Sequence, residues 1–480
     1  MRRRGLAPLV AASAAKPRRA ARLRRPSGLA GRAEIAWSAS EVGAWKKGRT
    51  RTALPVDLGC ETQTRNGEAV RITTVFQKLL AVTGLLVRAV GFEEEGLVLD
   101  VHPRWSKPRC GQCGRRRPTY DQSAPRKWRH LALGRTVVWL RYAPRRVDCP
   151  DCGVRVEQVP WAAHLSRFTR DLEEMAAYLA QQMDQTAVSK LLSIDWRTVG
   201  NIAERIVSER LDPKRLDGLE VVGVDELSFR RHHNYVTVVV DHRRRRVIWV
   251  GEGKSADTLR KFFDELGPER AAKLTHVTMD LSAAFIAAVD ERAPQAEKVY
   301  DRFHVQRLAS DAVDQVRRAE ARALAGTDAA AALKHSRWPL LKRPWNMEQR
   351  EDEKLGEVQR TNRKLYRAYL LKESLARALD YRQAARAERH LGGWMSWAAR
   401  CRLRPFMKLA RTIKRFKDGI LAYVRTRLSN GLTEGLNNKT RLITRRAFGF
   451  HSARALAAMI HLCCGGIMLA PPLPEPTYSP

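Results

Sequence analysis

Residues 220–251 read EVVGVDELSFRRHHNYVTVVVDHRRRRVIWVG and contain three predicted strands in succession. The apolar run after Glu220 ends on Asp225 and predicts a buried strand. Two runs rich in β-branched residues, 235–241 and 246–251, lie on either side of the basic turn 242–245 and predict a hairpin. We therefore expect three antiparallel strands at the start of this domain.

Helices and strands alternate after the hairpin. Residues 255–266 predict an amphipathic helix with Ser255 at its N-cap, and 276–280 predict a strand that ends on an acid. A helix over 282–292 and a strand that runs into residues 298–304 follow. This order predicts a mixed α/β domain with a ribonuclease-H-like sheet.

Four acidic residues end these predicted strands: Asp225, Asp241, Asp280 and Asp301. A strand-end aspartate often bonds only the backbone of its own turn. Carboxylates from neighbouring strands also converge on one point, where they hold Mg²⁺ ions for phosphodiester cleavage. The residues alone do not decide which of the four has that role.

A charged helical segment, residues 306–425, interrupts this domain and reads as an all-helical insertion. Its predicted aromatic anchors are Trp338, Trp345, Tyr366, Tyr369, Trp394 and Trp397. The break at 429–431 precedes a last helix that begins near Glu434.

Two Cys-x-x-Cys pairs lie in the N-terminal half, Cys110 with Cys113 and Cys149 with Cys152, and a glycine follows each pair. Two such knuckles complete a tetrahedral four-thiolate site, so we expect a structural Zn²⁺ with no open catalytic position. Reduced free thiols are the alternative. The alternating run 136–142 predicts a strand of a β-hairpin whose base the knuckles close.

Three helices are predicted over 171–183, 186–192 and 196–209, the last with Asp195 as its N-cap. Helices of this size form a helix-turn-helix whose last helix enters the major groove of DNA. A three-helix packing unit with no role in DNA binding is the alternative. The residues that we expect to face bases or phosphates are Trp196, Arg197, Asn201 and Arg205.

The net charge favours a nucleic-acid partner. The 480 residues contain 88 Lys and Arg against 51 Asp and Glu, a net charge of +37, and each basic group that meets a phosphate releases counterions. Residues 1–69 hold 15 basic and 5 acidic residues, which is +10, and predict a disordered basic arm or a start codon assigned too early. No apolar run reaches the roughly 18 residues of a membrane span, so we expect a cytoplasmic, nucleoid-associated protein.

These patterns predict six parts of the chain. They are a basic arm (1–69), a zinc-finger domain (70–165), a helix-turn-helix domain (166–212), a catalytic domain (213–305 and 426–470), a helical insertion (306–425) and a tail (471–480).

Four motifs in this order resemble those of bacterial insertion-sequence transposases with a DDE triad, specifically the ISL-three family. The motifs begin at Gly223 (GVDE), Met279 (MDLS), Tyr300 (YDRFHV) and Asn430 (NGLTEGLN). The resemblance extends from about residue 70 to 468 and includes the double CxxC finger and the helix-turn-helix.

The resemblance implies that Asp225, Asp280 and Glu434 hold two Mg²⁺ or Mn²⁺ ions. The choice of Glu434 over the acids of 348–357 rests on it. It also implies hydrolysis that exposes a 3′-hydroxyl, followed by attack of that hydroxyl on target DNA.

Three further residues are accessory candidates. His304 either contacts the scissile phosphate or packs behind the site, and Asn437 and Lys439 are either phosphate contacts or solvated helix residues. Pairing of two DNA ends favours a homo-oligomer on DNA. The competing interpretations are a non-catalytic DNA-binding regulator derived from a transposase, a stand-alone nuclease and a zinc enzyme.

Overall fold

The computed structural model describes residues 62–63, 69–230, 234–327, 329–428, 431–447 and 450–472. All of them belong to one of two units of the chain, residues 57–480. Most of the predicted basic arm, the break at Ser429 and Asn430 and most of the predicted tail lie outside these ranges.

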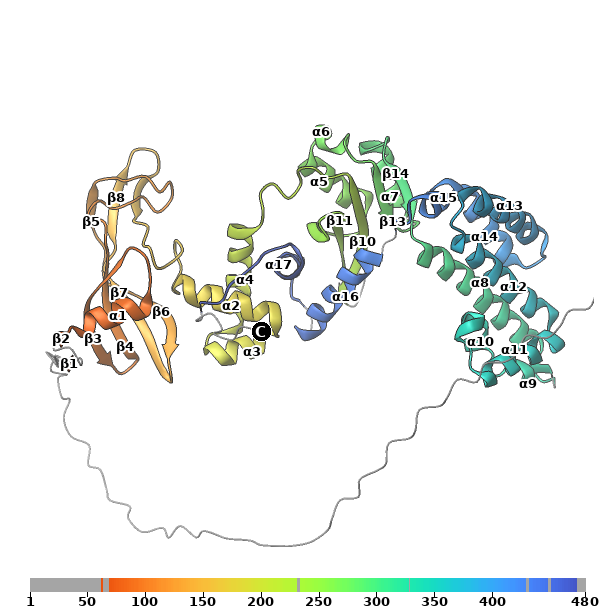
Figure 1. Cartoon of the computed structure of the whole chain (residues 1–480), viewed down its shortest axis with the longest axis horizontal. Helices are drawn as coiled ribbons and strands as arrows, with labels where there is room; N and C mark the ends of the chain where they lie inside the picture. Colours follow the sequence, from red (N-terminus) through yellow and green to blue (C-terminus); the bar gives the residue numbers. More distant parts are fainter. Residues whose placement is uncertain are drawn as a thin grey trace, which may run out of the picture. The chain divides into compact units, whose positions relative to one another are not determined.

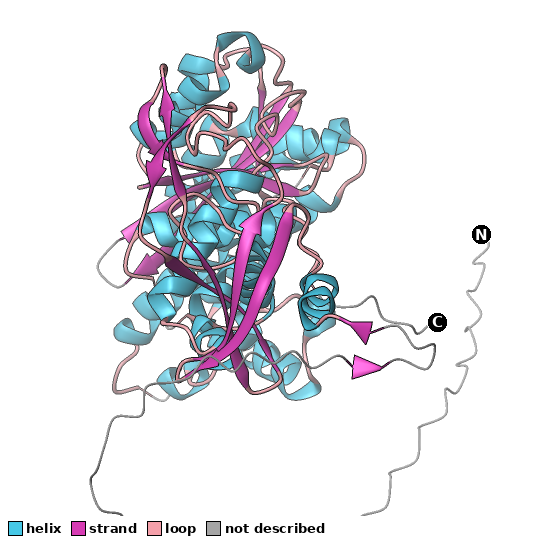
Figure 2. Cartoon of the chain, turned by 90° about the vertical axis from the view of Figure 1, so that its left-hand side faces the viewer, coloured by secondary structure: helices cyan, strands magenta, loops and turns pink. Residues whose placement is uncertain are grey.

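The first module is built almost entirely of strands (Figures 1 and 2). Its four-stranded sheet has the order β3-β4-β7-β6, and the short pair β1-β2 precedes it. The elements are β1 (Thr62–Gln63), β2 (Ala69–Val70), α1 (Ile72–Leu80), β3 (Leu85–Glu93), β4 (Gly96–Pro103), β6 (Arg126–Leu133) and β7 (Thr136–Tyr142). Strand β3 has a bulge between Val87 and Ala89, and this bulge interrupts its alternation.

A second, three-stranded sheet carries the cysteines. It consists of β5 (Thr119–Gln122), β8 (Arg145–Cys149) and β9 (Gly153–Val156), in the order β5-β8-β9. The predicted strand 136–142 is present as β7, but β7 pairs with β6 and β4 in the other sheet. The hairpin of β6 and β7 continues into the antiparallel pair of β5 and β8, and Cys149 ends β8 while Cys113 precedes β5. The prediction that the knuckles close the base of this hairpin is therefore confirmed.

The three helices of the helix-turn-helix are confirmed as α2 (Arg170–Gln182), α3 (Gln185–Leu192) and α4 (Trp196–Arg210). An oxygen-bearing side chain caps each helix, since Thr169, Asp184 and Asp195 accept hydrogen bonds from backbone N–H groups of the first turn. Asp195 Oδ1 accepts from the N–H of Arg197 at 2.8 Å.

A five-stranded mixed sheet follows, with the order β12-β11-β10-β13-β14. Strands β10, β11 and β12 are antiparallel neighbours, and β10, β13 and β14 are parallel neighbours. Its elements are β10 (Val221–Arg230), β11 (Asn234–Asp241), β12 (Arg246–Glu252), α5 (Ala256–Leu266), α6 (Pro268–Ala271), β13 (His276–Met279), α7 (Ala283–Arg292) and β14 (Glu297–Tyr300).

Strand β10 is longer than predicted. It continues five residues past Asp225 to Arg230, because Leu227 and Phe229 alternate with polar residues and the pairing with β11 continues through Leu227 and Ser228 to Arg230. Asp225 therefore lies within β10. The pairing of β10 with β13 ends two residues earlier, at Gly223.

The two faces of this sheet contribute to separate cores. One face packs with α5, α7 and the helical segment, through residues such as Val222, Val224, Phe262 and Phe406. The other face packs with the helix-turn-helix and with the last two helices, α16 (Gly431–Arg446) and α17 (Ala453–Cys464). Leu227, Val238, Ile202 and Leu456 belong to this second core.

The segment after β14 is helical, as predicted. Its elements are α8 (Arg302–Ala323), α9 (Ala329–Leu333), α10 (Arg337–Leu341), η1 (Pro344–Asn346), α11 (Gln349–Thr361), α12 (Arg363–Asp380), α13 (Ala384–Arg400), α14 (Arg404–Arg415) and α15 (Lys417–Thr426). The predicted boundary at 305/306 falls inside α8. Within the described ranges, no helix has both the length and the apolar character needed to cross a membrane.

Only some of the predicted aromatic anchors are buried. Trp394 and Tyr369 lie in the core, and Tyr366 packs against it. Trp338 and Trp345 are 61% and 71% exposed, and Trp397 is also exposed. Their assignment as anchors is wrong, because they lie on the outward faces of short or amphipathic helices.

Candidate active site and zinc site

Three adjacent parallel strands bring three aspartates to one level of the five-stranded sheet, where β13 and β14 end and β10 continues past Asp225. The register of β10 with β13, and of β13 with β14, places Asp225, Asp280 and Asp301 at the same level, one or two positions beyond the last paired residues. Neighbouring strands are about 4.8 Å apart, so side chains at one level are close enough to share a ligand.

Asp225 lies on the face of β10 that also carries Leu227 and Phe229, because side chains alternate along a strand. That face contributes to the core formed with α16 and α17, and α16 packs against β10. Burial raises the pKa of the half-buried Asp225 to about 7, and the negative charge of Asp280 adds to the effect. Two carboxylates that repel each other in a partly dry site would bind a cation favourably.

His304 lies in the first turn of α8, and its Nδ1 sits between two carboxylates. It is 2.7 Å from Asp280 Oδ1 and 3.1 Å from Asp301 Oδ2. The contact with Asp280, and then that with Asp301, raises the pKa of His304 to about 10, so the ring is a cation at neutral pH. In the metal-free geometry His304 thus neutralises part of the acidic cluster.

Asp301 is the member that the sequence did not single out. It is 4% exposed, and its Oδ1 has no hydrogen-bond partner among the described residues. The ligand atoms of Asp280, Asp301 and His304 lie within 4.8 Å of one another. A buried carboxylate oxygen without a donor fits a site for a hard divalent cation. The register of β13 with β14 identifies Asp301 as a member of the site, because it places Asp301 beside Asp280.

Asp241 is separated from this cluster. It pairs with Val222 at the opposite end of β10 and β11, about 10 Å along the strand from Asp225. Its Oδ1 accepts hydrogen bonds from the backbone of Arg243 and Arg244, at 2.8 and 3.2 Å, and the Arg244 guanidinium is 3.3 Å from Oδ2. Asp241 holds the β11–β12 turn.

Glu434 lies on the first turn of α16, but its side chain and that of Asn437 lie outside the described residues. The position of Glu434 near β10 rests on the packing of the helix backbone. Lys439 is exposed, and its Nζ donates to the carbonyl oxygen of Cys463 at 2.8 Å, which ties α16 to α17.

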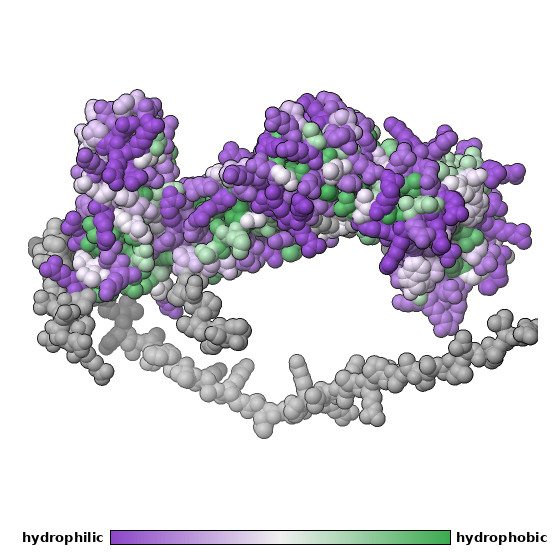
Figure 3. Space-filling view, turned by 45° about the horizontal axis from the view of Figure 1, so that its top comes forward, coloured by the Kyte–Doolittle hydropathy of each residue, from purple (hydrophilic) through white to green (hydrophobic). Residues whose placement is uncertain are grey.

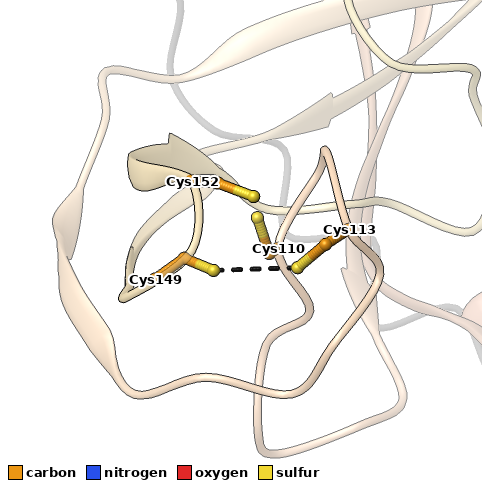
Figure 4. Close-up of side chains that lie close together, drawn as sticks. All are labelled: Cys110, Cys113, Cys149 and Cys152. Atoms are coloured by element: carbon orange, nitrogen blue, oxygen red, sulfur yellow. Dashed lines mark hydrogen bonds between the residues drawn. The ribbon is translucent and has the colours of Figure 1, made fainter.

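The four predicted zinc ligands converge, as Figure 4 shows. The sulfur atoms of Cys110, Cys113, Cys149 and Cys152 lie within 4.8 Å of one another, and the Sγ atoms of Cys113 and Cys149 are 3.7 Å apart. Four thiolates in this arrangement match a closed structural zinc site. Burial opposes ionisation of Cys149, but hydrogen bonds from the backbone of Asp151 and from Arg117 outweigh it and lower its pKa to about 6.

The helix-turn-helix presents part of the predicted DNA-contacting surface. Trp196, Arg197 and Asn201 are exposed at the start of α4, and the Arg197 guanidinium lies 5.9 Å from the Trp196 ring centre. Arg205 instead faces inward, 3.0 Å from the buried carboxylate of Glu173. We leave Arg205 out of the proposed DNA surface, because the ion pair already engages its guanidinium.

Three family models match successive parts of the chain. Residues 106–152 match the zinc-finger of transposase IS204/IS1001/IS1096/IS1165, and residues 157–207 match the helix-turn-helix domain of transposase family ISL3. Residues 222–460 match a model described as transposase.

Two curated relatives extend over most of the chain. The transposase for insertion sequence element IS1557 of Mycobacterium tuberculosis is 39% identical over 431 residues, which cover 83% of this chain and 96% of that protein. The transposase for insertion sequence element IS1001 of Bordetella parapertussis is 31% identical over 363 residues, which cover 75% of this chain and 89% of the relative.

Proposed function

The chain belongs to the ISL3 family of insertion-sequence transposases, and we propose that it cuts DNA at the ends of its element and joins the 3′-hydroxyl ends to target DNA. Asp225, Asp280 and Glu434 hold the catalytic metal ions in this proposal. The arrangement of three antiparallel strands followed by two parallel ones supports a ribonuclease-H-like catalytic domain.

The single observation that carries the proposal is the shared level of Asp225 and Asp280 on adjacent parallel strands, with α16 packed against β10. Two Mg²⁺ or Mn²⁺ ions, when bound, activate a nucleophilic oxygen and stabilise the leaving oxygen. The residues fit such ions, since hard cations prefer carboxylates and the site already contains a buried carboxylate oxygen without a donor.

The chain's own side chains have separate roles in this site. Asp225 and Asp280 point carboxylates at one position from a rigid sheet, which fixes the reacting groups in place. The protonated His304 holds Asp280, and Asp301 holds His304 in turn. His304 is therefore placed to supply positive charge near a phosphate. Pairing of two element ends requires at least two active sites, which favours a homo-oligomer on DNA.

The test is cleavage and joining of labelled DNA that carries the element ends, with Mg²⁺ or Mn²⁺ added. We expect metal-dependent 3′-end nicking followed by joined products. Specific end binding with no nicking under either metal would contradict the proposal and favour the non-catalytic regulator. Nicking without joined products would favour the stand-alone nuclease.

Replacement of the exposed side chains of α4 tests the reading of element ends. We expect Arg197→Ala with Asn201→Ala to weaken binding to element ends by at least tenfold, since each base-reading contact contributes about 1–3 kcal/mol. Binding to unrelated duplex should change much less. The measurement is a binding titration with both duplexes, and Arg210→Ala, on the same helix but paired with Glu174, is the control. Equal weakening on both duplexes would contradict base reading by α4.

A further inference from the structure

Helix α14 carries a dense positive charge that the proposed site does not use. Residues 400–417 contain eight Lys or Arg and no Asp or Glu. Arg404, Lys408, Arg411 and Arg415 recur at three- and four-residue spacing, so they form one stripe along the helix. All four are exposed. Hydrophilic residues cover much of the visible face of the described parts (Figure 3).

The stripe lies opposite the face that anchors the helix. Phe406, Leu409, Ala410 and Ile413 are buried in the core that α14 shares with the sheet and the other helices. The apolar face of α14 therefore packs in the core, and its basic face is exposed to solvent. Anchoring of this kind lowers the conformational entropy lost when a ligand binds.

The basic groups of the stripe have no acidic partner in the part of the chain that the structure describes. No carboxylate there lies within 4.0 Å of the charged groups of Arg404, Lys408 or Arg411. The guanidinium of Arg415 lies 5.2 Å from the ring centre of Phe416. Basic residues of the neighbouring helices differ, since many of them have an acid within that distance. Examples on α8 and α15 are Arg317, Arg318, Lys417 and Arg425.

Like charges at this spacing repel each other along a helix, and an anionic partner removes that repulsion. The stripe runs from residue 404 to residue 415, which is about 16 Å along the helix axis at 1.5 Å per residue. One strand of duplex DNA presents roughly five phosphates over that length, at about 3.4 Å of axis each. The charge and length of the stripe therefore match a segment of DNA backbone.

We propose that the basic stripe of α14 binds the phosphate backbone of duplex DNA outside the element end that the helix-turn-helix reads. This inference rests on the proposed function, because it assumes that the chain holds DNA while it cuts. The ligand chemistry is a duplex phosphate backbone without sequence preference. Its two sources are host DNA that flanks the element and the target duplex.

The test compares two triple variants of the full-length, zinc-loaded protein. One is Arg404→Gln, Lys408→Gln and Arg411→Gln. The control, Arg318→Gln, Lys364→Gln and Lys417→Gln, removes the same charge from basic residues that are already paired with acids. Dissociation constants are measured over a range of salt concentrations, without divalent metal, on a flush-cut element end, an end with flanking DNA, and a flush end with a separate duplex.

We expect the stripe variant to lose about 2.7 from the slope of log K against log salt, because each phosphate contact contributes about 0.9. The slope for the control variant should fall by less than about 0.9, which is the contribution of one phosphate contact. A loss seen only with attached flank identifies host DNA, and a loss seen with the separate duplex identifies target DNA. Binding to the flush end should not change.

Equal slopes for the stripe and control variants on every duplex would overturn the proposal. If the triple variant has a lower melting temperature than the control, the single variants Arg404→Gln and Arg411→Gln replace it, each with an expected loss of about 0.9. Because these are binding slopes measured without metal, their failure is distinguishable from a failure of the wild type to cleave.

Discussion

Asp225→Asn and Asp280→Asn should each lower the rate of element-end cleavage by at least about 10³-fold while end binding survives. A carboxamide cannot neutralise a divalent cation as a carboxylate does, and a loss of about 4 kcal/mol of transition-state stabilisation corresponds to that factor. Glu434→Gln should have the same effect if α16 completes the site. Single-turnover cleavage of a labelled end with saturating Mg²⁺ measures the change.

Asp241→Asn provides the matched control for this prediction. It also changes a strand-end aspartate of the same sheet, but Asp241 bonds the β11–β12 turn and not the cluster. We expect cleavage within a few-fold of wild type, because an asparagine oxygen still accepts the backbone hydrogen bonds. Near wild-type cleavage by Asp225→Asn or Asp280→Asn would show that another acid, with Asp301 as the first candidate, holds the metal.

Removal of zinc should unfold the three-stranded sheet and leave the four-stranded sheet folded. The small sheet has almost no apolar core of its own, since its buried cluster consists of Cys110, Val147 and Cys149 with Cys152 beside it. Structural zinc contributes about 10–16 kcal/mol of apparent binding free energy in small zinc-finger peptides, which far exceeds what one buried valine adds. The neighbouring sheet has a separate core that includes Leu85, Leu97, Leu140 and Trp161.

Hydrogen exchange before and after chelation, and in Cys149→Ser, measures this effect. Amides of β8 and β9 should lose protection by several orders of magnitude, and those of β4 and β7 should keep most of theirs. Cys463→Ser is the control, because this cysteine lies on α17 outside the cluster, and it should retain one zinc per chain. Intact protection of β8 in zinc-free protein would contradict a structural role for the metal.

Local periodicity predicted most of the elements. The three helices of the helix-turn-helix, the β11–β12 hairpin and the alternation through α5, β13, α7 and β14 each follow from patterns of apolar residues and capping side chains. The cysteine spacing predicted the four-sulfur cluster. Each Cys-x-x-Cys turn already holds two sulfur atoms together, so a single contact between the two turns completes the four ligands.

What the sequence left open depended on pairing between distant residues. Asp241 and Asp301 look alike as strand-end acids, and only the sheet register separates the turn residue from the neighbour of Asp280. The alternation of Leu227 and Phe229 with polar residues indicates that β10 continues past Asp225. The acidic residue at 225 instead predicted the end of the strand. The exposure of Trp338 and Trp345 depends on which helices surround them, which their own spacing does not encode.

The core on the second face of the sheet joins the helix-turn-helix to the sheet that carries the proposed catalytic aspartates. Ile202 of the recognition helix, Val238 of the sheet and Leu456 of α17 belong to the same buried cluster. A helix-turn-helix grafted from a relative would have to match that surface, since a mismatch exposes apolar strands and invites aggregation. Retargeting to new DNA ends should therefore succeed through the exposed residues of α4, such as Arg197 and Asn201, and fail through exchange of the whole module.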